Sequence, residues 1–278
     1  MDSLISGSIA GIVADVATHP LGTVKTRLQV QGASASSLTR YGGVAQGLTR
    51  ILTKEGVGAL YKGVGVVVAT AAPAQGLFFL GNDTAREALR PHLPAAAASF
   101  AAGCVAQLCG SLCWVPMDTV KERLQVEGQL KRGSKAELGG SWNAVRTILR
   151  REGLRGFYPA YWVHQATWAP FNGLFFAIYE ACKEYTNGLC SGVVAGVAAG
   201  FLTNPMDLVK TRLQVMRADP STFAYAGAFD CIGQILRREG PLAFLDGAIA
   251  RCATVAPRLT ICVLVKDAIA PGAKEILG

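Results

Sequence analysis

The sequence predicts an all-α membrane protein built from three tandem repeats, each with two membrane-spanning helices and a short amphipathic helix between them. A ten-residue pattern occurs three times, as PLGTVKTRLQ, PMDTVKERLQ and PMDLVKTRLQ, beginning at Pro20, Pro116 and Pro205. A Glu-Gly pair recurs in phase with it, and an aromatic residue follows each glycine four or five positions later. Because self-similarity at a fixed period indicates a repeat architecture, we expect three units at residues 1–92, 93–187 and 188–278.

The composition places these repeats in a membrane. Hydrophobic residues make up 51% of the chain and charged residues 17%, and the mean hydropathy is +0.32, which exceeds the usual range of a soluble domain. Each repeat contains two apolar stretches long enough to cross a hydrocarbon core of about 30 Å. The expected spans are residues 3–30, 66–89, 98–126, 161–184, 189–215 and 248–269.

Each repeat has the same order of elements. A first span contains the signature proline, a polar segment with glycine follows, and a second span comes after the Glu-Gly pair. Polar residues interrupt the spans, among them Asp15, Gln107, Thr167 and Arg258. Polar groups at membrane depth are tolerated where they line a water-filled cavity or pair with each other. We therefore expect the helices to surround a polar interior.

Several classes of function lack support in the sequence. It contains no HExxH, GxSxG or Walker motif, and its eight cysteines have no metal-binding spacing and are expected to be small buried side chains. We therefore expect neither an enzyme nor a metal or cofactor site. The net charge of +8 favours anionic lipid head groups as partners, whereas nucleic acid is not expected for so apolar a chain. No signal peptide or presequence is apparent, so any targeting is expected to be internal.

The three segments at Pro20, Pro116 and Pro205 resemble the signature Px[D/E]xx[K/R]x[K/R]xQ of the mitochondrial carrier family, and the resemblance covers essentially the whole chain. It implies a pseudo-threefold barrel of six helices in the mitochondrial inner membrane, with a short helix of each repeat on the matrix side. It further implies exchange of a small-molecule metabolite by alternating access, in a monomeric multi-pass protein that binds cardiolipin.

The resemblance also implies a ring of ion pairs that closes the matrix side, which we call the matrix gate. In this sequence Asp118 would pair with Lys210, and Asp207 would pair with Lys25. The family's supporting glutamines correspond to Gln29, Gln125 and Gln214.

This sequence departs from the family at Gly22, where the family places an acid. Lys121 is therefore expected to lack its usual partner, and the ring is expected to hold two ion pairs rather than three.

A second, cytoplasmic gate is implied by a [F/Y][D/E]xx[K/R] pattern, which is plain at Tyr179-Glu180 and degraded in the other repeats. Alignment on the prolines of the second spans gives the acids Asp83, Glu180 and Asp267 and the bases Arg86 and Lys183, with Ala270 in place of a third base. We expect Asp83 to pair with Lys183, and Asp267 with Arg86. Glu180 is left without a predicted partner.

Candidate substrate contacts lie between the two gates. Asp15 precedes Gly22 by two helical turns, so the two residues share one helix face, and a carboxylate at that depth would attract a cationic group. It would otherwise pair with a neighbouring cation. Arg258 would bind a substrate carboxylate or Asp15 itself. Arg251 and His164 occupy equivalent positions, which we place at the matrix-side rim.

A threonine stands three residues before the proline of each second span, as Thr70, Thr167 and Thr254. The family position makes these residues substrate contacts, whereas their chemistry would equally let them bond backbone carbonyls freed by the proline. Beside them, Trp168 offers an aromatic face to a planar base or a cation, or it packs as an ordinary core residue.

Within the family, AGxxxDxxxxPLxTxKTRLQ and PFNGLFFAIYE are similar to S-adenosylmethionine carriers and their relatives. Asp15 and Trp168 suit a sulfonium and an adenine, and Arg258 suits a carboxylate. Those carriers bear a charged pair where this chain has Thr167-Trp168. A metal ion or another amino acid or nucleotide therefore stays open as the cargo, as does a receptor or scaffold without transport.

Overall fold

The computed structural model describes residues 2–33, 38–130, 138–218 and 223–277. Over these residues the regular elements are helices, apart from an isolated β-bridge between Leu38 and Leu130. The first repeat contains α1 (Asp2–Val30), η1 (Gln31–Ala33), α2 (Val44–Glu55), α3 (Val57–Leu60) and α4 (Val64–Leu89). The second contains α5 (Ala95–Glu127), α6 (Ser141–Glu152), η2 (Leu154–Phe157) and α7 (Tyr161–Cys182). The third contains α8 (Gly188–Leu202), α9 (Asn204–Val215), α10 (Ala228–Arg238), η3 (Pro241–Leu245) and α11 (Ala248–Leu277).

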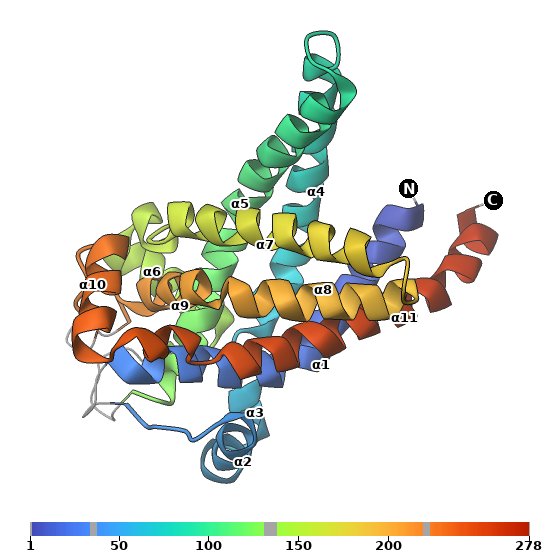
Figure 1. Ribbon diagram of the computed structural model, residues 1–278. Helices are drawn as coiled ribbons and strands as arrows, with labels where there is room; N and C mark the ends of the chain where they lie inside the picture. The colour runs from blue at the N-terminus through green and yellow to red at the C-terminus, as the bar shows by residue number, and fades with distance from the viewer. Residues whose placement is uncertain (1, 34–37, 131–137, 219–222, 278) are drawn as a thin grey trace.

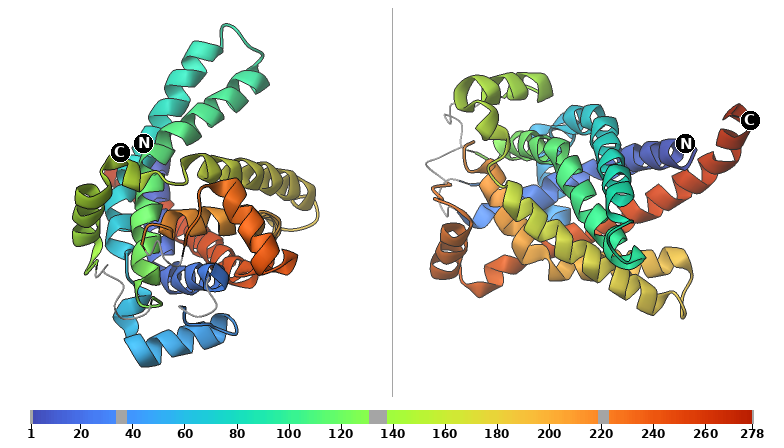
Figure 2. Two further views of the ribbon diagram at one scale, coloured as in Figure 1. Left: turned by 90° about the vertical axis from the view of Figure 1, so that its left-hand side faces the viewer. Right: turned by 90° about the horizontal axis from the view of Figure 1, so that it is seen from above.

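The long helices pack as antiparallel neighbours. Helix α1 lies beside α11, α7 lies beside α8, and α4 and α5 form a hairpin that projects beyond the other helices (Figures 1 and 2). The short helices α2, α6 and α10 lie near one end of the bundle, where α1, α5 and α9 finish. We call this end the proline end, because the signature prolines lie toward it.

The glycine of each Glu-Gly pair ends a short helix. Gly56, Gly153 and Gly240 have φ values of 84°, 66° and 86°, in the left-handed region where a side chain would be strained. This conformation turns the chain at the end of the short helix and directs it into the next helical segment. The phase relation between the two sequence motifs thus has a structural cause.

Three similar apolar clusters fix the short helices against the ends of the first spans. In the second repeat, Leu124 of α5 packs with Ile148 of α6 and Phe157 of η2, all of them buried. In the third repeat, Leu208 and Cys231 belong to the corresponding cluster. Burial raises the pKa of the Cys231 thiol to about 12, so this cysteine is a protonated apolar side chain, as expected. Cys104 and Cys190 are instead exposed, which corrects the expectation of burial for these two.

The fifth predicted span, residues 189–215, is not one straight helix. Helices α8 and α9 are bent by 64° at Thr203. Pro205 cannot donate a backbone hydrogen bond, and its ring opposes the continuation of the helix. The side-chain amide of Asn204 donates to the carbonyl oxygens of Phe244 at 2.8 Å and Asp246 at 3.3 Å, so the break is held by the segment before α11.

The helices differ in how apolar they are. Among the described residues, three helices are long and apolar enough to cross a membrane by length and composition alone, and four qualify when α8 and α9 count as one broken span. Helices α1 and α7, with 29 and 22 residues, are also long enough. They carry interior polar residues such as Asp15, His19 and His164, which lower their hydropathy.

Candidate functional site

A largely buried charge cluster occupies the proline end, where α1, α5 and α9 converge. We call it the charge cluster, and its members are Lys25, Asp118, Lys121, Glu122, Asp207 and Lys210. Lys25 Nζ lies 2.5 Å from Asp207 Oδ2, and Lys210 Nζ lies 2.9 Å from Asp118 Oδ2. These contacts join the first repeat to the third and the third to the second, with the partners that the sequence analysis assigned.

Lys121 finds a partner on its own helix. Its Nζ lies 2.6 Å from Asp118 Oδ1, three residues earlier in α5. No acid from the first repeat approaches it among the described residues, because Gly22 has no side chain there. Asp118 therefore holds two lysines at once, Lys121 through one oxygen and Lys210 through the other.

The three glutamines link the repeats in a cycle. Gln29 donates to Asp207 at 3.0 Å and accepts from the Thr211 hydroxyl at 2.9 Å. Gln125 accepts from the Thr26 hydroxyl at 2.8 Å. With its amide nitrogen turned toward Glu122, Gln214 donates to that carboxylate at 2.6 Å. Each glutamine thus contacts the residue that follows the signature lysine in another repeat.

A second cycle, which was not predicted from the sequence, is formed by arginines two residues after the signature lysines. Arg27, Arg123 and Arg212 are almost fully buried, and each pairs with the glutamate of the Glu-Gly motif of its own repeat. These pairs are Arg27–Glu55 at 2.5 Å, Arg123–Glu152 at 2.6 Å and Arg212–Glu239 at 2.5 Å. The nearly constant separation of each arginine from its glutamate along the chain, 28, 29 and 27 positions, was a signal that could have revealed the pairing.

Each of these arginines also reaches into the next repeat. Arg27 Nε donates to the backbone carbonyl of Gln125 at 2.8 Å, Arg123 Nε to that of Gln214 at 3.0 Å, and Arg212 Nε to that of Gln29 at 3.0 Å. We call each arginine, with its glutamate and its carbonyl, an arginine clamp. The three clamps tie the short helices to the first spans and close the repeats into a ring.

His164 and Arg251, which the sequence analysis placed at a rim, lie against the charge cluster. His164 Nδ1 is 3.7 Å from Asp118, and Arg251 Nη1 is 3.7 Å from Asp207. The Arg251 guanidinium also lies 5.7 Å from the centre of the Phe171 ring, a cation–π contact. Both side chains are buried, so they border the cluster rather than solvent.

At the opposite end of the bundle, the predicted pair of Asp83 with Lys183 does not form. Lys183 contacts Glu180, three residues earlier in the same helix, and Asp83 accepts a hydrogen bond from neighbouring Asn82 at 3.1 Å. No ion pair between α4 and α7 occurs in the described part of the chain. The predicted pairing of Arg86 with Asp267 lies outside the residues whose side chains the structure describes, as does Ala270.

Asp15 and Arg258 meet between the two ends. Arg258 Nε donates to Asp15 Oδ1 at 2.5 Å, which joins α1 to α11. The side chains remain 30% and 43% exposed, so the protein covers both charges only in part. Of the alternatives left open by the sequence, this conformation shows the pairing of the two residues with each other.

The hydroxyls of the three proline-associated threonines all bond to their own helices. Thr70 donates to the carbonyl of Val66, Thr167 to that of Val163, and Thr254 to that of Ala250, at 2.7 to 2.8 Å. A proline frees the carbonyl four residues before it, and these acceptors are not the freed ones. Each hydroxyl still has lone pairs with which it can accept a hydrogen bond.

Trp168 belongs to an aromatic group on α7. Its ring lies 5.3 Å from that of Phe171 and 6.1 Å from that of His164. The indole nitrogen is buried and has no acceptor among the described residues. A buried N–H donor without a partner is costly and uncommon.

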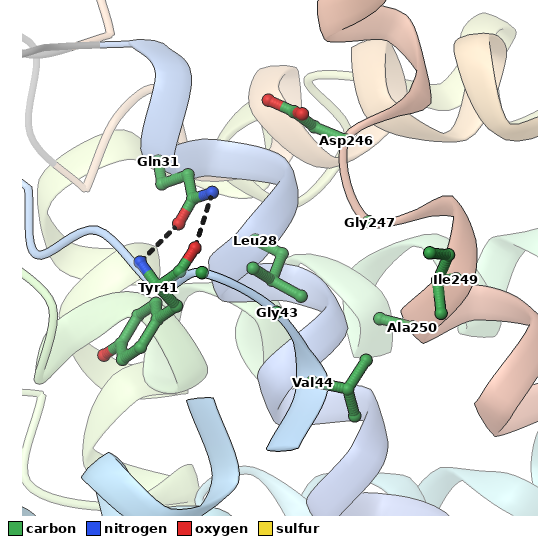
Figure 3. Close-up of a pocket in the computed structure, with 10 residues that line it drawn as sticks. Leu28, Gln31, Tyr41, Gly43, Val44, Asp246, Gly247, Ile249 and Ala250 are labelled. Atoms are coloured by element: carbon green, nitrogen blue, oxygen red, sulfur yellow. Dashed lines mark hydrogen bonds between the residues drawn. The ribbon is translucent and has the colours of Figure 1, made fainter. Parts of the chain in front are cut away.

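Two clefts lie outside the bundle interior, where short helices begin. The first, of about 260 Å³, is bordered by Tyr41 and Gly43 before α2 and by Asp246 and Gly247 before α11 (Figure 3). The side-chain amide of Gln31 shapes its wall through hydrogen bonds with the backbone N–H and carbonyl of Tyr41. The second cleft lies at the start of α6, beside Lys62. Each cleft lies between two different repeats.

Comparison with known proteins agrees with this architecture. The family model "Mitochondrial carrier protein" matches residues 1–93, 94–189 and 184–272. Mitochondrial substrate carrier family protein E of Dictyostelium discoideum is 35% identical over 91% of this chain and 90% of its own length. The probable S-adenosylmethionine carrier 2, chloroplastic, of Arabidopsis thaliana is 34% identical over 88% of this chain and 67% of its own length.

A third relative, the human mitochondrial electrogenic aspartate/glutamate antiporter, is 32% identical over 94% of this chain but only 39% of its own length. The family model covers nearly all of this chain in three matches that follow its repeats, and the helices form the expected paired spans. The chain is thus a multi-pass metabolite transporter of the inner mitochondrial membrane and belongs to the mitochondrial carrier family.

Proposed function

We propose that the protein exchanges a small zwitterionic metabolite with an amino-acid group, by alternating access. The single observation that carries this proposal is the contact between Asp15 and Arg258. The two residues offer one negative and one positive group, and both side chains remain partly exposed. An α-amino acid carries the complementary pair of charges, an ammonium for Asp15 and a carboxylate for Arg258.

The charge pair favours a doubly charged group over a singly charged one. A substrate that brings only one charge separates Asp15 from Arg258 and leaves one of them without a partner. An uncompensated charge at membrane depth is expensive. A zwitterion replaces both contacts at once, so the ion pair and the loaded site differ little in electrostatic energy.

S-adenosylmethionine fits this class, because it has an amino-acid group, a sulfonium and an adenine. The indole N–H of Trp168 is buried and has no acceptor among the described residues, so it would donate to such a base in a conformation that uncovers it. Acidic amino acids fit the same charge pair without using Trp168. Relatives named for each of these substrates match the chain at similar identity, so S-adenosylmethionine is one candidate within the class.

In this proposal the charge cluster with its glutamines is the matrix gate, and the acids and bases at the far end form the cytoplasmic gate. The closed cluster, and the absence of an ion pair between α4 and α7 in the described part of the chain, then correspond to a state open to the cytoplasm. Substrate binding would offset the loss of the cluster contacts, since alternating access requires two closed states of similar free energy.

An anionic lipid such as cardiolipin stays a predicted partner. The two clefts at the starts of α2 and α6 support the prediction. The first turn of a helix presents backbone N–H groups with a partial positive charge, which attracts phosphate.

Nothing in the described residues favours a metal ion as cargo, because no group of three ligating side chains occurs there.

The test is exchange by the purified protein in liposomes. The panel contains S-adenosylmethionine, glutamate and aspartate, together with a dicarboxylate and a diamine that each carry charge of one sign. We expect exchange of a zwitterion. Asp15→Asn and Arg258→Gln should each slow it by about tenfold or more, which corresponds to about 1.4 kcal/mol. Arg90→Gln, at an exposed site at the end of α4, is the matched control.

The double variant Asp15→Arg with Arg258→Asp separates substrate binding from a structural role. It restores the ion pair but reverses its orientation, so we expect normal thermal stability without exchange. Unchanged exchange kinetics in Asp15→Asn, or transport by the reversed pair, would remove these residues from the site. Exchange restricted to substrates with charge of one sign would overturn the substrate class.

A further inference from the structure

Glu122 breaks the threefold pattern of the sequence. The residue after the signature lysine is a threonine in the first and third repeats, Thr26 and Thr211, but a glutamate in the second. The second repeat is also the one whose lysine, Lys121, lacks an acid from another repeat, because of Gly22. Two departures from the pattern thus concern the same cluster.

The Glu122 carboxylate lies inside the charge cluster. The residue is 2% exposed, and one of its oxygens lies 3.8 Å from Lys210 Nζ. The amide nitrogen of Gln214 faces the carboxylate at 2.6 Å. At the equivalent points of the ring, a neutral threonine hydroxyl meets Gln125 or Gln29.

Among the six members of the charge cluster, the charges balance only when Glu122 is included, and Arg251, which borders the cluster at Asp207, adds a further positive charge. Three lysines, Lys25, Lys121 and Lys210, stand against two signature acids, Asp118 and Asp207. A buried lysine without compensation is strongly destabilising. A third acid restores equal numbers of lysines and acids.

We propose that Glu122 supplies the negative charge that is missing at Gly22, as a positioning residue of the closed cluster. Its effect reaches Lys121 through a shared partner. The Glu122 carboxylate neutralises part of the positive charge of Lys210. Asp118, which contacts Lys210 with one oxygen, can therefore hold Lys121 with its other oxygen. This inference rests on the proposed role of the cluster as the matrix gate.

Position 22 provides a matched way to return the charge. A Cβ built on Gly22 meets no atom within 4 Å, so an aspartate has room there. The hydrogen bond from Thr26 to Gln125 shows that α1 and α5 face each other one turn further on. Gly22 and Lys121 each stand four residues before one of these bonded residues, on the same faces.

The experiment measures thermal unfolding of the purified full chain and its exchange rate in liposomes. We compare Glu122→Thr, Glu122→Gln and Gly22→Asp, together with the double variant Gly22→Asp with Glu122→Thr. The glutamine variant keeps the shape and the polarity of the side chain but removes the charge. Thr26→Val removes the neutral equivalent of Glu122 in the first repeat and is the matched control.

We expect Glu122→Thr and Glu122→Gln to lower the melting temperature by similar amounts, of several degrees. Gly22→Asp should return most of this loss, and it should raise the melting temperature more in the Glu122→Thr background than in the native one. It should not repair Thr26→Val. The exchange rates of the variants should follow the same order as their melting temperatures, since a cluster with unbalanced charges spends less time closed.

A Glu122→Gln variant as stable as the native protein would show that only the hydrogen bond matters and would overturn the proposal. Equal effects of Gly22→Asp in both backgrounds would do the same. The melting temperatures require no substrate, so this result is independent of the liposome panel. If Gly22→Asp recovers the melting temperature but the protein exchanges no metabolite, the result supports the charge balance and refutes the role of the cluster in transport.

Discussion

The three proline-associated threonines differ in exposure, although their hydrogen bonds are alike. Thr167 is 1% exposed, whereas Thr70 and Thr254 are only partly buried. All three hydroxyls donate within their own helices, so a substrate can only donate to them in this conformation. Thr254 stands one helical turn from Arg258, on the same helix as this member of the proposed charge pair.

We therefore predict that Thr70→Val and Thr254→Val raise the KM for exchange severalfold, because valine keeps the shape but cannot accept a hydrogen bond. Thr167→Val should lower thermal stability by about 1 kcal/mol and leave the KM unchanged. Measurements of KM in liposomes and of melting temperature test both parts. Thr→Ser at each position should behave as the native residue. Equal KM values for all three valine variants would make the threonines helix braces only.

At the scale of elements, the arginine clamps explain why the short helices are placed alike in every repeat. Arg123 is 2% exposed and contacts Glu152 at the end of α6, the carbonyl of Gly156, and the carbonyl of Gln214 in the next repeat. One side chain thus joins a first span, a short helix and a neighbouring repeat. An arginine is suited to this role because its planar group donates in several directions.

Removing one clamp should destabilise the whole molecule. We predict that Arg123→Met costs on the order of 3 kcal/mol, since it leaves a partly buried glutamate and two carbonyls without their donor. Arg150→Met, at an exposed site on α6, should change stability by less than about 0.5 kcal/mol. Denaturation of both variants in one detergent gives the comparison. The double variant Arg123→Met with Glu152→Met should recover part of the loss, and failure to do so would mean that the carbonyl contacts carry the energy.

The broken fifth span shows how context acts on a repeated motif. Pro20 and Pro116 lie inside continuous helices, whereas Pro205 follows a bend of 64°. The residue before the proline differs, and in the third repeat it is Asn204, whose amide bonds two carbonyls of the segment before α11. These bonds stabilise a bend that the proline alone does not impose.

At the scale of the whole molecule, the sequence was informative wherever one residue type repeats with a fixed spacing. The repeats, the short helices and the contacts of Lys25 with Asp207 and of Lys210 with Asp118 follow from aligned motifs. The contact of Lys121 with Asp118 could not be predicted. It depends on where the Asp118 carboxylate, which Lys210 also contacts, lies when position 22 carries no acid. Glu122 was missed for a related reason, since its partners Lys210 and Gln214 come from another repeat.

The pairing of the far end could not be read from the sequence either. Residues of α4 and α7 that share a motif pattern do not meet in this conformation, because the projecting hairpin of α4 and α5 stands apart from the other helices (Figures 1 and 2). A motif records which residues can pair in some state. It does not record which state is populated, so the pairs of Asp83 and Asp267 stay predictions.

The clamp contacts run from the first repeat to the second, from the second to the third, and from the third back to the first. The order of repeats along the polypeptide is therefore not encoded in these contacts, which would be the same from any starting repeat. A circular permutant that begins with α5, ends with α4 and joins α11 to the neighbouring α1 through a flexible linker should keep all three clamps. We predict that it folds and exchanges the same substrates as the native chain. A permutant that folds but loses exchange would show that the covalent connection of α4 to α5 serves the transport cycle itself.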